Sequence, residues 1–296
     1  MLCDPLKYLI DPGLLMVKSL KKYFLVFTAP TLAAFLIAFL VPFFMGLYLS
    51  FTNFRTITDA QWIGVENYRQ VFAEANNFLP ALLFTALVSA VSILTVNLGA
   101  FALAYMLTRK LKGTNFFRTV FFMPNLIGGL VLGYTWQAML NGILSNWDLT
   151  VVSDWRLGFA GLIFVSNWQL MGYMMIIYIA GLQNVPPELI EAAQIDGASK
   201  SRILRSVTIP IMVPSITICL FLTLANTFKM YDQNLALTNG APLNQTQMVA
   251  LNIVNTMYTK NNMEGVAQAM AVIFFVIVSV IALLQLRATR SKEIDQ

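Results

Sequence analysis

"NVPPELIEAAQIDGASKSRILRSVTIPIMVPS" occupies residues 184–215, a polar stretch between two long apolar runs. Pro186 and Pro187 suit the start of a helix, where a missing N–H has no intrahelical partner to lose. Gly197 suits its end, because glycine readily takes the left-handed conformation that closes a helix. The helix between them has about ten residues and is roughly 15 Å long. It is too short to cross a bilayer, so we expect it to lie in a loop.

The composition around this loop indicates an integral membrane protein. Apolar residues make up 58% of the 296-residue chain and charged residues 11%, whereas soluble domains have roughly half and a quarter. Because a span needs about 20 apolar residues, the sequence predicts an all-α protein of about six transmembrane helices. The apolar windows fall near residues 23–50, 78–107, 120–140, 158–181, 211–235 and 266–286.

These windows divide the chain simply. Residues 1–22 are expected to form a cytoplasmic tail, residues 23–290 a transmembrane domain, and residues 291–296 a second cytoplasmic tail. The stretch quoted above belongs to the loop at 182–209. Little chain remains for a separate soluble domain.

Lysine and arginine predict which side of the membrane each loop faces. Fourteen of the 19 Lys and Arg residues lie in the N-terminal tail, the loop at 108–119, the loop at 182–209 and the C-terminal end. Since short loops rich in Lys and Arg stay in the cytoplasm, both termini and the 182–209 loop should be cytoplasmic. The positive charges are spread over four segments, whereas a nucleic-acid partner would need one basic patch with aromatic residues.

Several kinds of chemistry are excluded by what the sequence lacks. There is no histidine, which excludes zinc or haem sites that need imidazole. There is no Gly-Lys dipeptide, so the phosphate-binding loop of many ATPases is impossible. No pair of acidic residues sits at metal-ligand spacing within a span. We therefore expect no catalytic residue and no metal site in this chain.

The short helix of the 182–209 loop has a slim surface. Leu189, Ile190 and Ala193 can share one face, and alanine and glycine around them allow close approach of another backbone. An ordinary surface helix is the alternative. The slim surface is typical of a helix that fits into a cleft of another protein.

The wider pattern resembles a known family. Glu191-Ala192-Ala193-x-x-Asp196-Gly197-Ala198, followed by "VTIP" at 207–210 and by Pro214, is similar to the EAA signature of binding-protein-dependent ABC importer permeases. Leu204 and Ile209 depart from the usual Phe and Leu but stay apolar. Further stretches resemble the sugar-uptake branch of maltose and glycerol-phosphate permeases: "WIGVENYRQVF" (62–72), "FFRTVFFMPNLIGG" (116–129), "LTNGAP" (237–242) and "LLQLRATR" (283–290).

The resemblance implies a function and a set of partners. The chain would be a permease subunit in a bacterial or archaeal plasma membrane, forming half of a pathway for a carbohydrate such as an oligosaccharide. It would work with a second related permease, two cytoplasmic ATPase subunits and an extracytoplasmic solute-binding protein. ATP and Mg would be bound by the ATPase subunits, and this chain would bind no cofactor. The ATPase-coupling residues implied are Glu191, Ala192, Ala193, Asp196, Gly197 and Ala198.

Polar residues in the fourth and fifth spans are the candidates for the carbohydrate pathway, since polar groups inside a membrane are costly and often functional. By position, the resemblance points to Gln169, Tyr173, Thr223, Asn226, Thr227 and Met230. Hydrogen bonding between helices is the alternative role for each of them. We assign that role to Asn97, and we expect Gly129 and Gly133 to allow close helix packing.

Two other functions compete with transport. A membrane-embedded enzyme acting on a lipid-linked substrate would need clustered acidic residues at the membrane face, and the sequence lacks such a cluster. A scaffold without a pathway would not need polar residues inside two spans.

Overall fold

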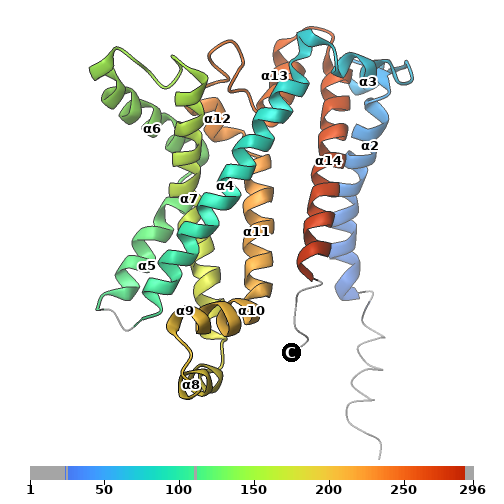
Figure 1. Ribbon diagram of the computed structural model, residues 1–296. Helices are drawn as coiled ribbons and strands as arrows, with labels where there is room; N and C mark the ends of the chain where they lie inside the picture. The colour runs from blue at the N-terminus through green and yellow to red at the C-terminus, as the bar shows by residue number, and fades with distance from the viewer. Residues whose placement is uncertain (1–23, 25, 110–111, 291–296) are drawn as a thin grey trace, which may run out of the picture.

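The computed structural model describes residue 24, residues 26–109 and residues 112–290, which form a helical bundle with one short β-hairpin (Figure 1). The expected tails at 1–22 and 291–296 lie outside the described residues. Four helical segments in the described part are long and apolar enough to span a membrane: Val26–Leu49, α4 (Phe78–Leu107), α7 (Trp155–Gln183) and Glu264–Ala288 of α14 (Glu264–Arg290). Two sharply bent helix pairs bring the count to six if each pair is one span.

The first span contains a widened helical turn. A π-helical turn, η2 (Leu36–Leu40), lies in the span, and α2 (Val41–Leu49) forms its last part. Pro42, in the first turn of α2, has no N–H to donate to the carbonyl of Ala38, so regular helical bonding is interrupted at this point. The span pairs with α14, where the rings of Phe43 and Phe275 meet edge to face at 5.1 Å.

The expected third span at 120–140 is not one helix. The structure has α5 (Thr114–Phe122), a 3-10 turn η5 (Met123–Leu126) and α6 (Gly129–Leu144), with a bend of 101° between the two parts. Pro124 removes a backbone donor, and Ile127 and Gly128 adopt extended backbone conformations, which end the first helix. The expectation of a continuous helix was wrong because apolarity extends across a proline and glycine break.

The expected fifth span at 211–235 is also divided. A helical approach of α9 (Lys200–Ile203), η7 (Leu204–Thr208) and α10 (Ile209–Ile211) leads, through a bend of 71°, into α11 (Val213–Phe228). The helix ends at Phe228, and a separate short helix, α12 (Asp232–Leu237), follows. Gly129 and Gly133 lie directly against α12, where added side-chain carbons would collide with Asp232 and Ala236. The expected close packing at these glycines is confirmed, with α12 as the neighbour.

One end of the bundle carries the connections predicted to be external. They comprise the hairpin of β1 (Thr52–Asn53) and β2 (Gln61–Trp62), the helices α3 (Glu66–Val71) and α13 (Val249–Thr259), and the 3-10 turns η3 (Ile57–Asp59), η4 (Glu74–Asn76) and η6 (Ser145–Trp147). Asn67 ties this end together, because its amide donates to the carbonyls of Ser50 at 2.9 Å and Thr52 at 2.8 Å. Figure 1 shows α3 and α13 at the top, while the helix α8 (Pro187–Ile195) projects from the opposite end. The two ends are therefore built differently.

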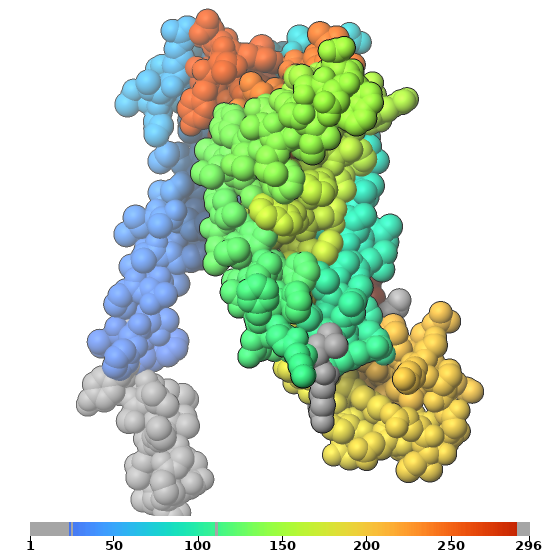
Figure 2. Space-filling view, turned by 90° about the vertical axis from the view of Figure 1, so that its left-hand side faces the viewer, coloured from blue at the N-terminus to red at the C-terminus, as the bar shows by residue number. Residues whose placement is uncertain are grey.

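Helix α4 runs through all three apolar clusters of the core. Phe78 belongs to a cluster with α13 and α14, Phe84 to one with α7 and α12, and Ala100 to one with α7 and α11. Lipid is as apolar as these side chains, so close packing rather than water exclusion holds such helices together. The first span is the least enclosed, with 6% of its apolar window buried. Figure 2 shows this blue segment at the edge of the molecule and the residues around α8 as a separate protrusion.

Candidate functional site: the projecting helix and a polar cluster between spans

The projecting helix α8 is capped at both ends by its own sequence. Pro186 is its N-cap, Pro187 opens the helix and Glu188 lies in the first turn, where a negative charge interacts favourably with the helix dipole. At the other end Gly197 has φ +76°. The N–H of Gly197 bonds the carbonyl of Gln194 at 3.0 Å, and that of Ala198 bonds the carbonyl of Ala193 at 2.9 Å. These paired bonds are a Schellman cap, so the expected stop at Gly197 is confirmed.

The surface of α8 is mostly free. Ile195 is 87% exposed and Leu189 48% exposed, while Ile190 packs against the apolar cluster at the base of α4 and α7. Of the three residues expected to share a face, Ile190 and Ala193 are half-buried and Leu189 points to the exterior. A helix that is anchored on one side and carries exposed apolar residues among polar ones on the other can bind a partner without losing its position on the bundle.

The connection from α8 to the spans is stiff. Ser199 caps α9 by accepting a bond from the N–H of Arg202, and Ile203, Thr208 and Met212 are buried. Pro210 interrupts regular helical bonding after the widened turn η7. The chain between α8 and α11 is therefore largely helical and packed against the bundle.

A polar cluster joins three spans in the middle of the bundle. The hydroxyl of Tyr178 on α7 donates to Oδ1 of Asn97 on α4 at 2.8 Å. The amide of Asn97 donates to the Thr223 hydroxyl on α11 at 3.2 Å and to the carbonyl of Ile93 at 2.7 Å. Asn97 is 8% exposed and Tyr178 2%. The structural role expected for Asn97 is confirmed, and Thr223 takes part in it.

The six residues expected to line the carbohydrate pathway do not converge on one point in this chain. Thr223 and Thr227 are fully buried, and their hydroxyls bond carbonyls of their own helix. Met230 is also buried, with its sulfur 3.7 Å from the Ser166 hydroxyl. These three side chains pack the spans together in this conformation.

Of the other three, Asn226 and Tyr173 lie in more open positions, whereas Gln169 is buried. Asn226 is exposed on α11, with its amide bonded to the carbonyl of Leu222. Tyr173 is half-buried, 6.5 Å from the ring of Phe122. Gln169 is 9% exposed and accepts a 2.6 Å bond from the amide of Gln233 on α12. Of the six, Asn226 is the polar side chain that a neighbouring molecule can reach most easily.

Two residues of this region were missed by the sequence reasoning. Gln233 bonds Gln169 across 64 positions, and Tyr178 bonds Asn97 across 81 positions. Both are polar residues next to apolar ones, and this pattern in the sequence could have indicated a polar contact between helices. Their partners became apparent only from the packing of α7 against α4 and α12.

The six residues that the resemblance implies for ATPase coupling lie together on the projecting element. Glu191, Ala192 and Asp196 are exposed, Gly197 is exposed at the cap, and Ala193 and Ala198 are half-buried beneath them. A small cavity of about 280 Å³ beside the cap is lined by Ala193, Asp196, Gly197 and Ala198 together with residues of α9 and η7. The exposed residues of this group are accessible on the surface of the projecting element.

The fold is shared with solved transporters. A bacterial ABC transporter involved in the import of the acidic polysaccharide alginate has a chain with a TM-score of 0.78 to this one, at 22% identity, covering 93% of this chain and 98% of that chain. A second structure of an alginate ABC transporter, in complex with an alginate pentasaccharide-bound periplasmic protein, matches with a TM-score of 0.76 and 21% identity, over 93% of this chain and 96% of that chain. At such identity the likeness describes the fold alone.

Closer relatives exist in sequence. The chain is 41% identical over 281 residues to the probable starch degradation products transport system permease protein AmyD of Thermoanaerobacterium thermosulfurigenes, covering 92% of this chain and 96% of the relative. It is 31% identical over 266 residues to the multiple sugar-binding transport system permease protein MsmF of Streptococcus mutans, covering 86% and 91%. The family model described as binding-protein-dependent transport system inner membrane component matches residues 103–292. The chain therefore belongs to the family of inner membrane components of binding-protein-dependent transport systems.

Proposed function

We propose that this chain is one permease subunit of an ATP-driven importer and forms half of the translocation pathway for a carbohydrate, with an oligosaccharide as cargo. The observation that carries the proposal is the 41% identity to a permease named for transport of starch degradation products, over 92% of this chain. The second relative, named for a multiple sugar-binding transport system, supports the same class of cargo. As a family member the chain is a multi-pass protein of the inner membrane.

The projecting helix supplies the coupling to ATP hydrolysis. Coupling needs a structural element whose position depends both on the ATPase and on the cargo pathway. Helix α8 is capped and is joined to α11 through the helical segments α9, η7 and α10. Two cytoplasmic ATPase subunits would bind at its exposed face. ATP and Mg would be held by those subunits, and this chain would take no part in the bond-breaking step.

The other partners are a second related permease and a solute-binding protein. A solved alginate transporter with this fold is in complex with a periplasmic protein that carries a pentasaccharide, which supports a binding-protein partner here. We place its binding at the end opposite α8, because the 182–209 loop is rich in Lys and Arg and is expected to be cytoplasmic. A single chain exposes Asn226 on α11 rather than enclosing it. We infer that a second permease completes the pathway on that side.

The experiment reconstitutes the complex in proteoliposomes with its ATPase subunits and its binding protein. ATP hydrolysis is measured with a panel of malto-oligosaccharides, other neutral oligosaccharides, alginate oligosaccharides and short peptides. The proposal expects stimulation by at least one carbohydrate, with uptake of the same sugar. Stimulation by peptides alone would overturn the choice of cargo.

Two variants test the coupling role in the same assay. Glu191→Ala and Gly197→Ala should leave the chain in the membrane and abolish sugar-stimulated uptake. Gly197 has no atom near enough to clash with a side chain, so its effect would come from the left-handed backbone, which costs other residues about 1 kcal/mol. Glu74→Ala, an exposed charge at the opposite end, is the control. Normal uptake by both α8 variants would contradict the coupling role.

The competing reading as an enzyme acting on a lipid-linked substrate has no support from these relatives. It predicts product formation by the purified chain without ATPase subunits, and the proposal predicts none.

A further inference from the structure

A cavity lies between the projecting helix and the ends of the spans. Its volume is about 390 Å³, and its lining comes from the last turn of α4, the end of α7, and α8, α9 and η7. Ile190 of α8 and Ile203 of α9 form part of its apolar wall. A molecule bound here would touch the coupling helix and the bundle at the same time.

The cavity is positively charged. Arg109 and Lys200 line it, and no acidic residue does. Within the part of the chain that the structure describes, neither cation has a carboxylate within ion-pair distance, since the one ion pair there joins Glu66 and Arg69 at the far end. The guanidinium of Arg109 lies over the ring of Tyr105 at 4.8 Å, and this stacking holds it at the cavity wall. Two unpaired cations beside neutral donors such as Gln194 form a site for an anion.

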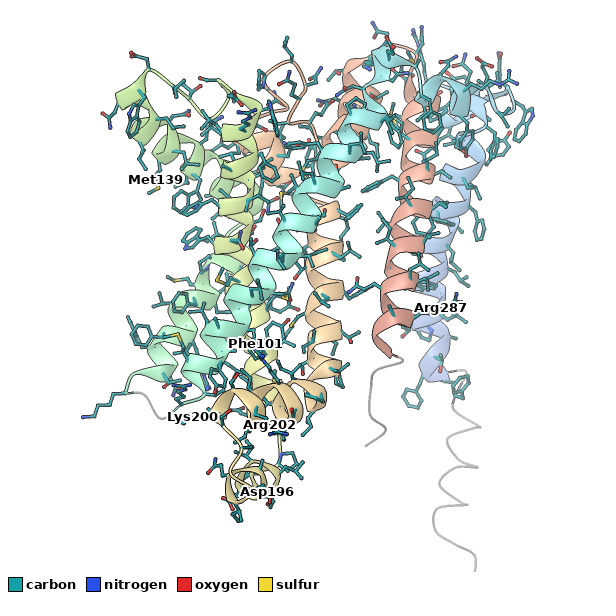
Figure 3. All side chains as sticks on the ribbon, viewed as in Figure 1. Phe101, Met139, Asp196, Lys200, Arg202 and Arg287 are labelled. Carbon is teal, nitrogen blue, oxygen red and sulfur yellow. The ribbon has the colours of Figure 1, made fainter. Side chains whose placement is uncertain are left out.

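An apolar groove begins directly above this cavity. Its volume is about 490 Å³, and it lies between α4 and α11, lined by residues such as Leu94, Leu98 and Leu220. The two spaces share a border, because Phe101 in the groove stacks on Tyr105 in the cavity with ring centroids 6.3 Å apart. Figure 3 labels Phe101 on α4 and Lys200 on α9 near the end of the molecule that carries α8.

The dimensions of the groove match those of an acyl chain. It follows α4 from Ala90 to Phe101, a rise of about 16 Å in an α-helix. The two polar residues in its wall, Asn97 and Tyr178, are hydrogen-bonded to each other. A molecule in the groove therefore does not need to supply hydrogen-bond partners for them. A cationic cavity at the end of the spans, continued by an apolar groove along them, has the shape and charge of a site for a phospholipid with an anionic headgroup.

We propose that this chain binds one anionic phospholipid, with the phosphate-containing headgroup between Arg109 and Lys200 and an acyl chain along α4 and α11. The lipid would hold the coupling helix against α4. The inference rests on the proposed function in one respect, the side of the membrane. The end that carries α8 must face the cytoplasm, so that the cytoplasmic leaflet supplies the lipid.

The assembled complex is placed in nanodiscs that contain equal amounts of dioleoylphosphatidylglycerol and dioleoylphosphatidylcholine and is then purified from them. The test measures which of the two lipids stays bound to the purified complex. We expect the wild-type complex to retain phosphatidylglycerol selectively. Arg109→Gln/Lys200→Gln should weaken this retention about tenfold or more, because each basic residue near an anionic headgroup contributes roughly a fivefold change in affinity. Leu98→Trp, at a position 64% exposed, should fill the groove and displace the lipid without changing the charge.

The matched control removes two charges from the same end but outside the cavity. Lys112→Gln/Arg287→Gln, both exposed positions, should retain the lipid as the wild type does. Equal loss in the control would show general electrostatic attraction and overturn the site. Retention by both the cavity and the groove variants would overturn it too, as would full competition by soluble glycerol phosphate, which would indicate an anion site without a lipid.

The result is separable from the transport assay. Retention is measured on the purified complex whether or not any sugar stimulates ATP hydrolysis. A complex that retains phosphatidylglycerol at these residues but responds to no carbohydrate would contradict the proposed cargo and leave the lipid site in place. If a partner permease fills the groove, no selective retention will be found, and the lipid site is then wrong.

Discussion

The hydroxyl of Tyr178 donates a 2.8 Å hydrogen bond to Oδ1 of Asn97, although the two residues are 81 positions apart. Through the amide of Asn97 the same pair reaches Thr223 on α11. The three spans that meet here include α7, which leads into the projecting helix, and α11, which leads away from it. This cluster therefore keeps together the two spans on either side of the loop at 182–209.

Replacing Tyr178 with Phe should destabilise the bundle modestly. The change leaves Oδ1 of Asn97 buried without its donor, and hydrogen bonds between transmembrane helices are worth about 0.6 kcal/mol on average and up to about 1.7. The unfolding temperature of the purified complex in detergent would measure the loss. Tyr258→Phe, at a site 82% exposed, serves as the control. Identical unfolding of the two variants would show that the cluster contributes nothing to stability.

Replacing Gly172 with Ala should be more damaging. Helix α5 crosses α7 so closely that a Cβ on Gly172 would overlap the backbone carbonyl of Phe121. Backbone cannot rotate away as a side chain can, so the helices must separate, at a cost of about 3 kcal/mol. Gly142→Ala on α6 has no atom within 4 Å of the added carbon and should be harmless. The yield of folded chain after membrane extraction compares the two, and equal yields would contradict this packing.

Replacing Ile195 with Ser should weaken ATPase binding without affecting the fold of the chain. Ile195 is 87% exposed on α8, and burying such a side chain in an interface contributes about 1.5–3 kcal/mol, which corresponds to an affinity loss of roughly tenfold or more. Co-purification of the ATPase subunits at decreasing concentration would measure it. Leu243→Ser, 90% exposed at the opposite end, removes a comparable side chain and should retain them. Equal retention by both variants would place the ATPase contact elsewhere.

Asn226 and Thr227 are neighbours in sequence, but Asn226 is exposed and Thr227 is buried. Replacing each in turn therefore distinguishes an effect on cargo contact from an effect on helix packing. Asn226→Ala should raise the sugar concentration for half-maximal uptake several-fold with little change in unfolding temperature, because its side chain is exposed. Thr227→Val should lower the unfolding temperature instead, since its buried hydroxyl bonds the carbonyls of Thr223 and Leu224. Uptake kinetics and thermal unfolding of both variants provide the comparison. The reverse pattern would show that α11 presents a different face to the cargo.

Much of the fold could be predicted because its determinants are local. The long spans follow from continuous apolar runs, and α8 follows from a proline at its start and a glycine at its end, whose left-handed conformation the structure confirms. The bends were harder to predict. Pro124 and Gly128 stand inside a run that remains apolar, and apolarity alone does not distinguish a straight span from one bent by 101°. Their effect depends on α5 and α6 packing against different neighbours.

The sequence by itself determined that this is a helical membrane protein with a short capped helix between its last long segments, because hydropathy and capping depend on residues close together in the chain. Only the tertiary structure decided which polar residues hold helices together and which face outward. Thr223 and Asn226 lie three positions apart on α11, yet one is buried against Asn97 and the other is exposed. The difference arises from the direction in which α4 and α7 cross α11. That direction is set by contacts between residues about 50 to 130 positions apart, and no local pattern records it.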